Sequence, residues 1–135
     1  MIKNISHITF ISKDLKKTSR FLKQVFNAKE IYSSGDKTFS IAKEKFFKIG
    51  ELWVAIMEGE SIKRSYNHIA FAVDVTELPI LKSKIKKLGL TILQGRKRRP
   101  EEGTSLYFYD YDNHLFELHA GDLKTRLNYY AHANK

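Results

Sequence analysis

The chain has 135 residues, an ordinary size for one globular domain and short for two independent domains. Apolar residues make up 42% and charged residues 29%, which excludes a disordered or collagen-like chain. The sequence contains no cysteine, so it has no disulfides, no thiolate metal ligands and no cysteine nucleophile. A metal site would therefore depend on histidines and carboxylates.

The formal net charge of +9 favours an anionic partner, whether nucleic acid, anionic lipid or a small phosphorylated or phosphonate substrate. The densest basic cluster is Arg96-Lys97-Arg98-Arg99, and the Pro100-Glu101-Glu102-Gly103 segment after it is typical of a loop. Two interpretations of this cluster stay open: a loop exposed to solvent, or a segment that contacts an anionic ligand. No zinc-finger spacing or RNA-binding aromatic motif accompanies the cluster, so nucleic-acid recognition is unsupported.

Neither a signal peptide nor a membrane span is predicted. The first residues lack the apolar segment of a signal peptide, and no run approaches the roughly 20 apolar residues that span a bilayer. We therefore expect a cytoplasmic protein.

The first half of the chain predicts a strand, a helix and a closing strand. Ile5 to Ile11 alternates partly between apolar and polar residues, as a half-buried strand does. Lys16 to Phe26 places its apolar residues on one helical face, and Asp14 is a plausible cap for this helix. The apolar run from Leu52 to Gly59 predicts a strand.

The second half repeats this order. His68 to Val75 is rich in apolar residues with strand propensity, and Leu78 to Leu88 has the periodicity of a helix. Thr76 is the predicted helix cap, and Gly89 lies where a helix-ending glycine is expected. His114 to Gly121 closes this half as a strand.

The two halves are related by an internal repeat. Ser6-His7-Ile8-Thr9-Phe10 is echoed by Asn67-His68-Ile69-Ala70-Phe71, 61 positions later, and Leu52 to Gly59 aligns with His114 to Gly121. The sequence therefore predicts an α+β fold of two βαβββ modules, at about residues 3–60 and 66–121, with a C-terminal helix or tail at 122–135. Because modules this short are marginal alone, we expect them to pair into a cupped mixed sheet within one domain spanning residues 1–135.

This repeat points to a metal site. His7 and His68 occupy equivalent strand positions, and equivalent residues can converge near a pseudo-twofold axis. Glu117 lies within an apolar strand, where a buried carboxylate costs several kcal/mol without a partner, and a metal ion would supply that partner. His119 is a candidate hydrogen-bond donor behind the metal ligands. The counterpart of Glu117 is Ala55, so two imidazoles and one carboxylate would leave coordination positions open for water or substrate. The set suits Mn(II), Fe(II), Zn(II), Co(II) or Ni(II), although a lone strand histidine is more often a hydrogen-bonded core residue.

Several segments resemble the vicinal oxygen chelate (glyoxalase) superfamily and, within it, the FosX-type fosfomycin resistance proteins, which are epoxide hydrolases: Ser6–Thr9, Tyr32–Lys37, Lys43–Phe47, Asn67–Phe71, Tyr107–Asp110 and Glu117–Gly121. The similarity runs from Ile5 to about Tyr130. It implies a homodimer, in which one site can draw residues from both chains, and a divalent cation, with Mn(II) expected, held by His7, His68 and Glu117.

The same resemblance assigns the remaining site residues. In the hydrolase branch a glutamate acts as general base in the attack of water on a phosphonate epoxide, which gives a diol phosphonate, and Glu44 lies at the matching position. Arg126 resembles the phosphonate-binding arginine of the family, and Thr9 and Tyr107 resemble its hydroxyl donors. Arg98, in the basic loop, is a further candidate for binding the phosphonate.

Three rival functions stay open. The first is a fosfomycin thiol transferase on the same metal site; Thr9 disfavours the branch with a cysteine at that position, but the glutathione-dependent branch also has a threonine there. Glu101 to Ser105 matches the potassium loop of that branch only partly, so no potassium site is expected. The second rival is an extradiol dioxygenase or glyoxalase, and the third is a protein that only sequesters an anionic ligand.

Overall fold

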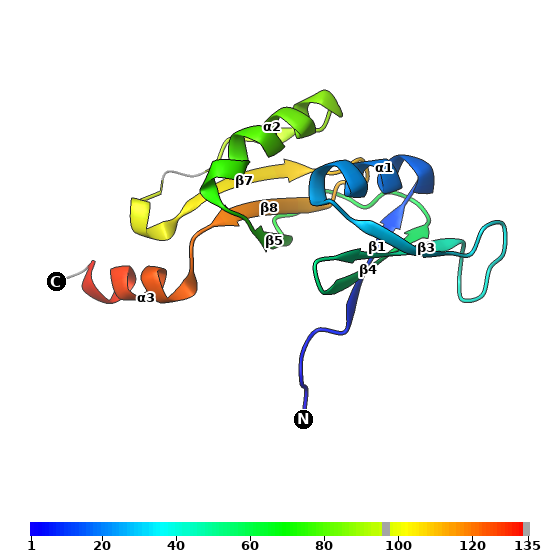
Figure 1. The fold of residues 1–135 in the computed structure, drawn as a ribbon, viewed down its shortest axis with the longest axis horizontal. Helices are drawn as coiled ribbons and strands as arrows, with labels where there is room; N and C mark the ends of the chain where they lie inside the picture. Colours follow the sequence, from blue (N-terminus) through cyan, green and yellow to red (C-terminus); the bar gives the residue numbers. More distant parts are fainter. Residues whose placement is uncertain (96–97, 134–135) are drawn as a thin grey trace. The chain divides into compact units, whose positions relative to one another are not determined.

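Figure 1 shows a computed structural model of the protein, which describes residues 1–95 and 98–133. The chain forms two compact units. Unit 1 comprises Met1–Arg64 with Tyr111–His114, and unit 2 comprises Ser65–Asp110 with Leu115–Lys135. Each unit combines a four-stranded mixed sheet with helical segments, which confirms the α+β class.

Unit 1 is built from five elements in the predicted order: β1 (His7–Ser12), α1 (Leu15–Phe26), β2 (Lys29–Ser33), β3 (Glu44–Ile49) and β4 (Leu52–Glu58). The strand order is β1-β4-β3-β2, with β1 parallel to β4 and the other pairs antiparallel. The side chain of Asp14 accepts a hydrogen bond from the backbone N–H of Lys17, which confirms the predicted cap of α1. The helix ends at Phe26, and the cap residue that follows, Asn27, has a left-handed φ of 53°.

Unit 2 repeats the plan and extends it with two short 3-10 turns and a third helix: β5 (His68–Ala72), η1 (Val75–Glu77), α2 (Leu78–Lys87), β6 (Ile92–Leu93), η2 (Pro100–Glu102), β7 (Thr104–Tyr109), β8 (Leu115–Ala120) and α3 (Leu123–His132). Its strand order, β5-β8-β7-β6, matches that of unit 1. Thr9 pairs with Ala55 in unit 1, and Ala70 pairs with Glu117 in unit 2. The predicted repeat is therefore confirmed, with Ala55 as the counterpart of Glu117.

Two details of the second module differ from prediction. The strand β5 ends at Ala72 rather than Val75, because Val75–Glu77 turns into a 3-10 helix. Thr76 lies inside that turn and cannot cap α2; the cap position is Glu77, whose side chain makes no capping hydrogen bond. Gly89 has a φ of 73°, as a helix-ending glycine should.

Each sheet has one apolar face under its helix. In unit 1 the fully buried residues Phe47, Val54 and Ile56 face Phe21 and Leu22 of α1. In unit 2, Phe108, Phe116 and Leu118 form the corresponding layer under α2, together with Ile85. Strand alternation sends the residues between them to the opposite face, and the candidate site residues lie there.

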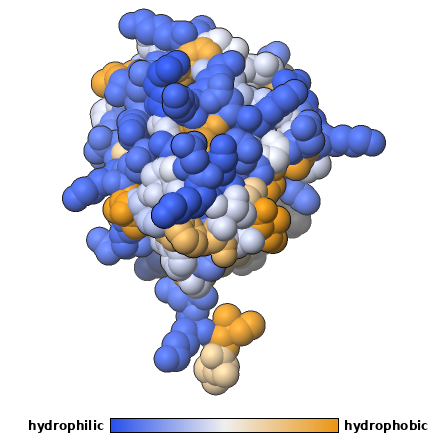
Figure 2. All heavy atoms as spheres, turned by 90° about the vertical axis from the view of Figure 1, so that its right-hand side faces the viewer, coloured by the Kyte–Doolittle hydropathy of each residue, from blue (hydrophilic) through white to orange (hydrophobic). Residues whose placement is uncertain are grey.

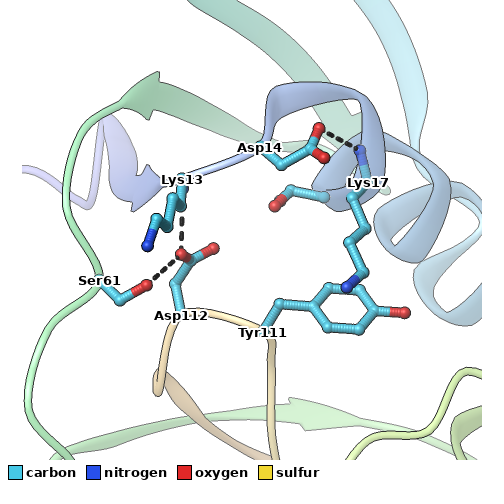
Figure 3. A pocket seen from close by; sticks show the side chains of 7 residues that line it. Lys13, Asp14, Lys17, Ser61, Tyr111 and Asp112 are labelled. Atoms are coloured by element: carbon cyan, nitrogen blue, oxygen red, sulfur yellow. Dashed lines mark hydrogen bonds between the residues drawn. The ribbon is translucent and has the colours of Figure 1, made fainter.

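The turn at 111–114 is tied into unit 1 by Asp112, which is 2% exposed. Its carboxylate accepts hydrogen bonds from the backbone N–H of Lys13, at 3.0 Å, and from the hydroxyl of Ser61, at 2.7 Å (Figure 3). The ammonium of Lys17 lies 4.1 Å from the centre of the Tyr111 ring, at the wall of the same cavity of about 170 Å³. These polar contacts hold the turn at residues 111–114 against the rest of unit 1.

The surface is strongly polar, in keeping with the net charge of +9. Hydrophilic residues dominate the face shown in Figure 2, where apolar side chains appear only as separate patches. Among the described residues, no helix combines the length and hydrophobicity needed to cross a membrane.

The core of unit 1 makes a first prediction. Phe21 is fully buried, so Phe21→Ala should lower the free energy of unfolding by about 3–5 kcal/mol, as measured by urea denaturation of the metal-free protein. Phe39, which is 69% exposed, is the matched control, and Phe39→Ala should change stability far less. Equal losses for the two variants would contradict this placement of the core.

Candidate active site

A histidine and a carboxylate meet on the sheet face of unit 2 that lies away from α2. The Nε2 atom of His68 is 3.1 Å from Oε1 of Glu117, whose side chain is 7% exposed. The Nδ1 atom of His68 lies 2.7 Å from the carbonyl oxygen of Tyr66, and because a carbonyl can only accept, Nδ1 carries a hydrogen. In the neutral imidazole, the Nε2 lone pair therefore faces a carboxylate oxygen. This arrangement suits a cation, which would bind both atoms.

The second oxygen of Glu117 is held by other residues of unit 2. The hydroxyl of Ser105 donates to Oε2 at 2.5 Å, and Arg98 Nη2 lies 3.5 Å from the same atom. Burial raises the pKa of Glu117, but the hydrogen bonds from Ser105 and Tyr107 and the charge of Arg98 together outweigh burial, so the pKa of the carboxyl lies below its usual range. Glu117 is thus kept ionised and oriented, as a metal ligand must be.

His119 extends this hydrogen-bonded arrangement towards α3. Its Nδ1 lies 2.6 Å from the Ser105 oxygen, which can accept from it while donating to Glu117. Its Nε2 then faces Arg126 Nη2 at 3.4 Å. Burial lowers the pKa of His119, the neighbouring arginines Arg126 and Arg98 lower it further, and Glu117 opposes them. The prediction that His119 supports Glu117 agrees with this geometry.

Tyr107 and Arg98 form a polar pair beside the carboxylate. Arg98 Nη2 donates to the Tyr107 hydroxyl at 2.6 Å, and the ring of Tyr66 stacks on Tyr107 with a centroid separation of 6.3 Å. Burial raises the pKa of Tyr107, and the hydrogen bond with Tyr66 and the charge of Glu117 raise it further. Tyr107 therefore remains a neutral phenol that can donate a hydrogen bond to an anion.

Arg126 reaches this group from α3. Its Nη2 donates to the backbone carbonyl of Glu102 at 2.8 Å. Arg98 also donates to that carbonyl, at 3.4 Å. Two guanidinium groups therefore converge next to Tyr107, and the site has the positive charge needed to bind a small dianion.

Unit 1 carries the other predicted residues on one face of its sheet. The strand register places His7 opposite Trp53, Thr9 opposite Ala55 and Glu44 opposite Met57, so all three point away from α1. The ring of His7 stacks on Trp53 with centroids 4.1 Å apart. Its Nδ1 lies 3.0 Å from the hydroxyl of Ser6.

Glu44 is a largely buried carboxylate, 9% exposed, at the start of β3. The hydroxyl of Ser40 donates to its Oε2 at 3.1 Å. Its backbone N–H donates to the Ser34 hydroxyl at 3.0 Å, and the backbone of Ser34 donates to its carbonyl. One oxygen of the side chain is therefore held in place by Ser40.

The structure thus brings together the predicted residues of unit 2: His68, Arg98, Tyr107, Glu117 and Arg126. In unit 1 it places the other predicted residues on one face of the sheet: His7, Thr9 and Glu44. No three histidine or acidic side chains among residues 1–95 and 98–133 form a ready metal-binding group. Arg96 and Lys97 of the predicted basic loop lie outside the described residues.

Residues of these arrangements that were not predicted include Ser40, Tyr66, Glu102 and Ser105. Ser105 and Tyr66 each precede a predicted site residue by two positions, and strand alternation could have suggested Ser105 as a neighbour of Tyr107. The sequence carries no such signal for Ser40 or Glu102, because their hydrogen bonds depend on how loops fold back.

Comparison with known proteins places the chain in a family. Residues 4–118 match the Glyoxalase/Bleomycin resistance protein/Dioxygenase superfamily. The chain is 59% identical to the fosfomycin resistance protein FosX of Listeria innocua, over 96% of this chain and 98% of that protein. The chain belongs to the FosX fosfomycin resistance proteins. The resemblance noted in the sequence is confirmed.

FosX proteins are also close in structure. A crystal structure of a FosX mutant from Listeria monocytogenes, complexed with Mn(II) and 1S,2S-dihydroxypropylphosphonic acid, has a TM-score of 0.88 and 54% identity, and the match covers 96% of this chain and 99% of that one. The metallothiol transferase FosB of Bacillus licheniformis is more distant, at 37% identity over 96% of this chain and 82% of that protein. The FosX proteins are therefore closer relatives than these thiol transferases.

The environment of Glu117 makes a second prediction. Removing the donor in Ser105→Ala should raise the pKa of Glu117 in the metal-free protein, because the ionised form loses its short hydrogen bond. Carboxyl carbon NMR against pH measures the change directly. Glu30 is an internal control in unit 1. Its pKa is also lowered, by Lys45 and Lys23, and should be the same in Ser105→Ala as in the parent protein. An unchanged or lower pKa for Glu117 would show that Ser105 does not stabilise the carboxylate.

Proposed function

We propose that the protein is a Mn(II)-dependent fosfomycin epoxide hydrolase, in which water opens the epoxide of fosfomycin to give a diol phosphonate and so confers resistance to the antibiotic. The observation that carries the proposal is the close match to FosX, including a FosX structure that holds Mn(II) and a dihydroxypropylphosphonic acid. The cluster of His68, Glu117, Arg98, Tyr107 and Arg126 supports it, because groups suited to bind a cation lie beside groups suited to bind an anion.

His7, His68 and Glu117 are the proposed metal ligands. The pairing of His68 Nε2 with Glu117 Oε1 at 3.1 Å fits a divalent cation, and Mn(II) accepts such mixed imidazole and carboxylate sets. When bound, the cation supplies Lewis acidity that stabilises the negative charge developing on the epoxide oxygen as its bond to carbon breaks.

Glu44 is the proposed general base. With Oε2 held by Ser40, Oε1 takes a proton from the attacking water as the water oxygen bonds to a ring carbon and the bond between that same carbon and the epoxide oxygen breaks. The burial of Glu44 limits the competing water that would otherwise solvate it. The proton then passes to the alkoxide, which completes the diol.

The phosphonate is held by the proposed substrate residues Thr9, Tyr107, Arg126 and Arg98. A dianion that leaves water must recover its hydrogen bonds, and two guanidinium groups and a neutral phenol supply strong donors. The net charge of +9 adds long-range attraction for such a substrate.

A third prediction tests both metal and base. Mn(II)-loaded protein in thiol-free buffer should convert fosfomycin to a new phosphonate visible by phosphorus NMR, and a chelator should abolish this conversion. Glu44→Gln should lower kcat by about 10²- to 10⁴-fold, because the amide cannot accept the proton. Glu51→Gln, at an exposed glutamate in the turn between β3 and β4, is the matched control and should keep full activity.

The same assay separates the rival functions. Product that forms only after glutathione or another thiol is added would identify a thiol transferase. Binding of fosfomycin that survives chelation, with no product under any condition, would identify a sequestering protein. Epoxide opening that needs no oxygen and no hemithioacetal excludes dioxygenase and glyoxalase activity.

We also propose that the protein acts as a homodimer in the cytoplasm, with one domain spanning residues 1–135 in each chain. The family resemblance supports pairing. The prediction is a solution mass, by light scattering, of twice the 15.7 kDa chain mass at micromolar concentration. A monomer at every concentration tested would contradict it.

A further inference from the structure

The C-terminal helix α3 is not anchored by a hydrophobic core. None of its described residues is buried, and Leu123 and Leu127 are 71% and 54% exposed. Its main contact within unit 2 is with the 3-10 turn η2, beside which it lies in Figure 1. Because burial of apolar surface contributes little, polar contacts with η2 determine where the helix sits, and with it Arg126.

Glu102 is the residue of η2 that makes these contacts. Its carboxylate accepts from the Tyr130 hydroxyl of α3 at 2.8 Å and from the backbone N–H of Arg99 at 3.2 Å. Its backbone carbonyl accepts from Arg126 at 2.8 Å and from Arg98 at 3.4 Å. The residue is only 7% exposed. One buried residue therefore contacts the loop, the helix and both arginines.

We infer that Glu102 and Tyr130 are positioning residues that set the spacing of Arg98 and Arg126 for a substrate with a doubly charged phosphonate group. The inference rests on the proposed function, in which these two arginines bind the phosphonate. Neither Glu102 nor Tyr130 needs to touch substrate. Their effect passes through the shared carbonyl and through the position of α3.

The physical reason is the repulsion between two like charges. Two guanidinium groups repel each other, so they move apart when nothing holds them. The free energy needed to bring them together again then weakens the binding of a dianion. A common acceptor at the Glu102 carbonyl holds them close before the substrate arrives. The Tyr130 hydrogen bond keeps α3, and so Arg126, within reach of that acceptor. The arrangement favours a compact dianion that can bridge both arginines over a monoanion that needs only one.

The test compares two adjacent tyrosines of α3 in the Mn(II)-loaded, full-length protein. Tyr130→Phe removes only the hydroxyl that bonds to Glu102, and should raise KM for fosfomycin by about threefold to tenfold, with kcat changed by less than about twofold. Tyr129→Phe removes a hydroxyl from the same helix without touching Glu102, and should leave both constants unchanged. In the Glu102→Ala background, Tyr130→Phe should raise KM no further, because the two residues act together.

Each outcome is decisive. A KM for Tyr130→Phe equal to that of the parent protein, or equal increases for the two tyrosine variants, would overturn the inference. A lower unfolding temperature for Tyr130→Phe without a change in KM would show that the hydrogen bond only stabilises the fold, and would also overturn it. If Glu102→Ala does not fold, the comparison of the two tyrosines still decides. Failure of the parent protein to convert fosfomycin would instead count against the proposed function.

Discussion

The pairing of Glu117 with His68 is the constraint on which unit 2 depends. A carboxylate that is 7% exposed on a central strand would lose its hydration at a cost of several kcal/mol unless other groups replaced the water. The sheet provides those groups, because β8 lies between β5 and β7 and so receives His68 from one side and Ser105 and Tyr107 from the other. Arg98 and His119 complete the shell around Oε2. Under the proposed mechanism, a cation binds on the Oε1 side, next to His68.

The duplication explains why one sheet bears this charge and the other does not. The two sheets share one strand order, yet Ala55 stands in unit 1 where Glu117 stands in unit 2. Unit 1 thus has an apolar residue at that central position and presents His7, Thr9 and Glu44 on the matching face. Under the proposed mechanism, one module supplies the base and the other most of the groups that bind the cation and the phosphonate.

Much of the fold could be predicted because the chain repeats itself. Equivalent motifs at His7 and His68 fixed the module plan, and apolar periodicity located α1 and α2 within one or two residues. The cap at Thr76 was wrong because this residue lies in a 3-10 turn, which periodicity does not reveal, and Glu77 takes the cap position of α2.

Less of the candidate site could be predicted from the sequence. The roles of Glu44, Arg126 and Tyr107 came from family resemblance and stay predictions, while Glu102 and Ser40 act through hydrogen bonds between loops and distant elements.

The central claim is that water, and not a thiol, opens the epoxide. The most direct measurement is mass spectrometry of the product formed by the Mn(II)-loaded protein from fosfomycin in water labelled with oxygen-18, without any thiol. The account predicts a diol phosphonate that carries one labelled oxygen on carbon in every molecule formed. A product without label, or no product until a thiol is added, would contradict it.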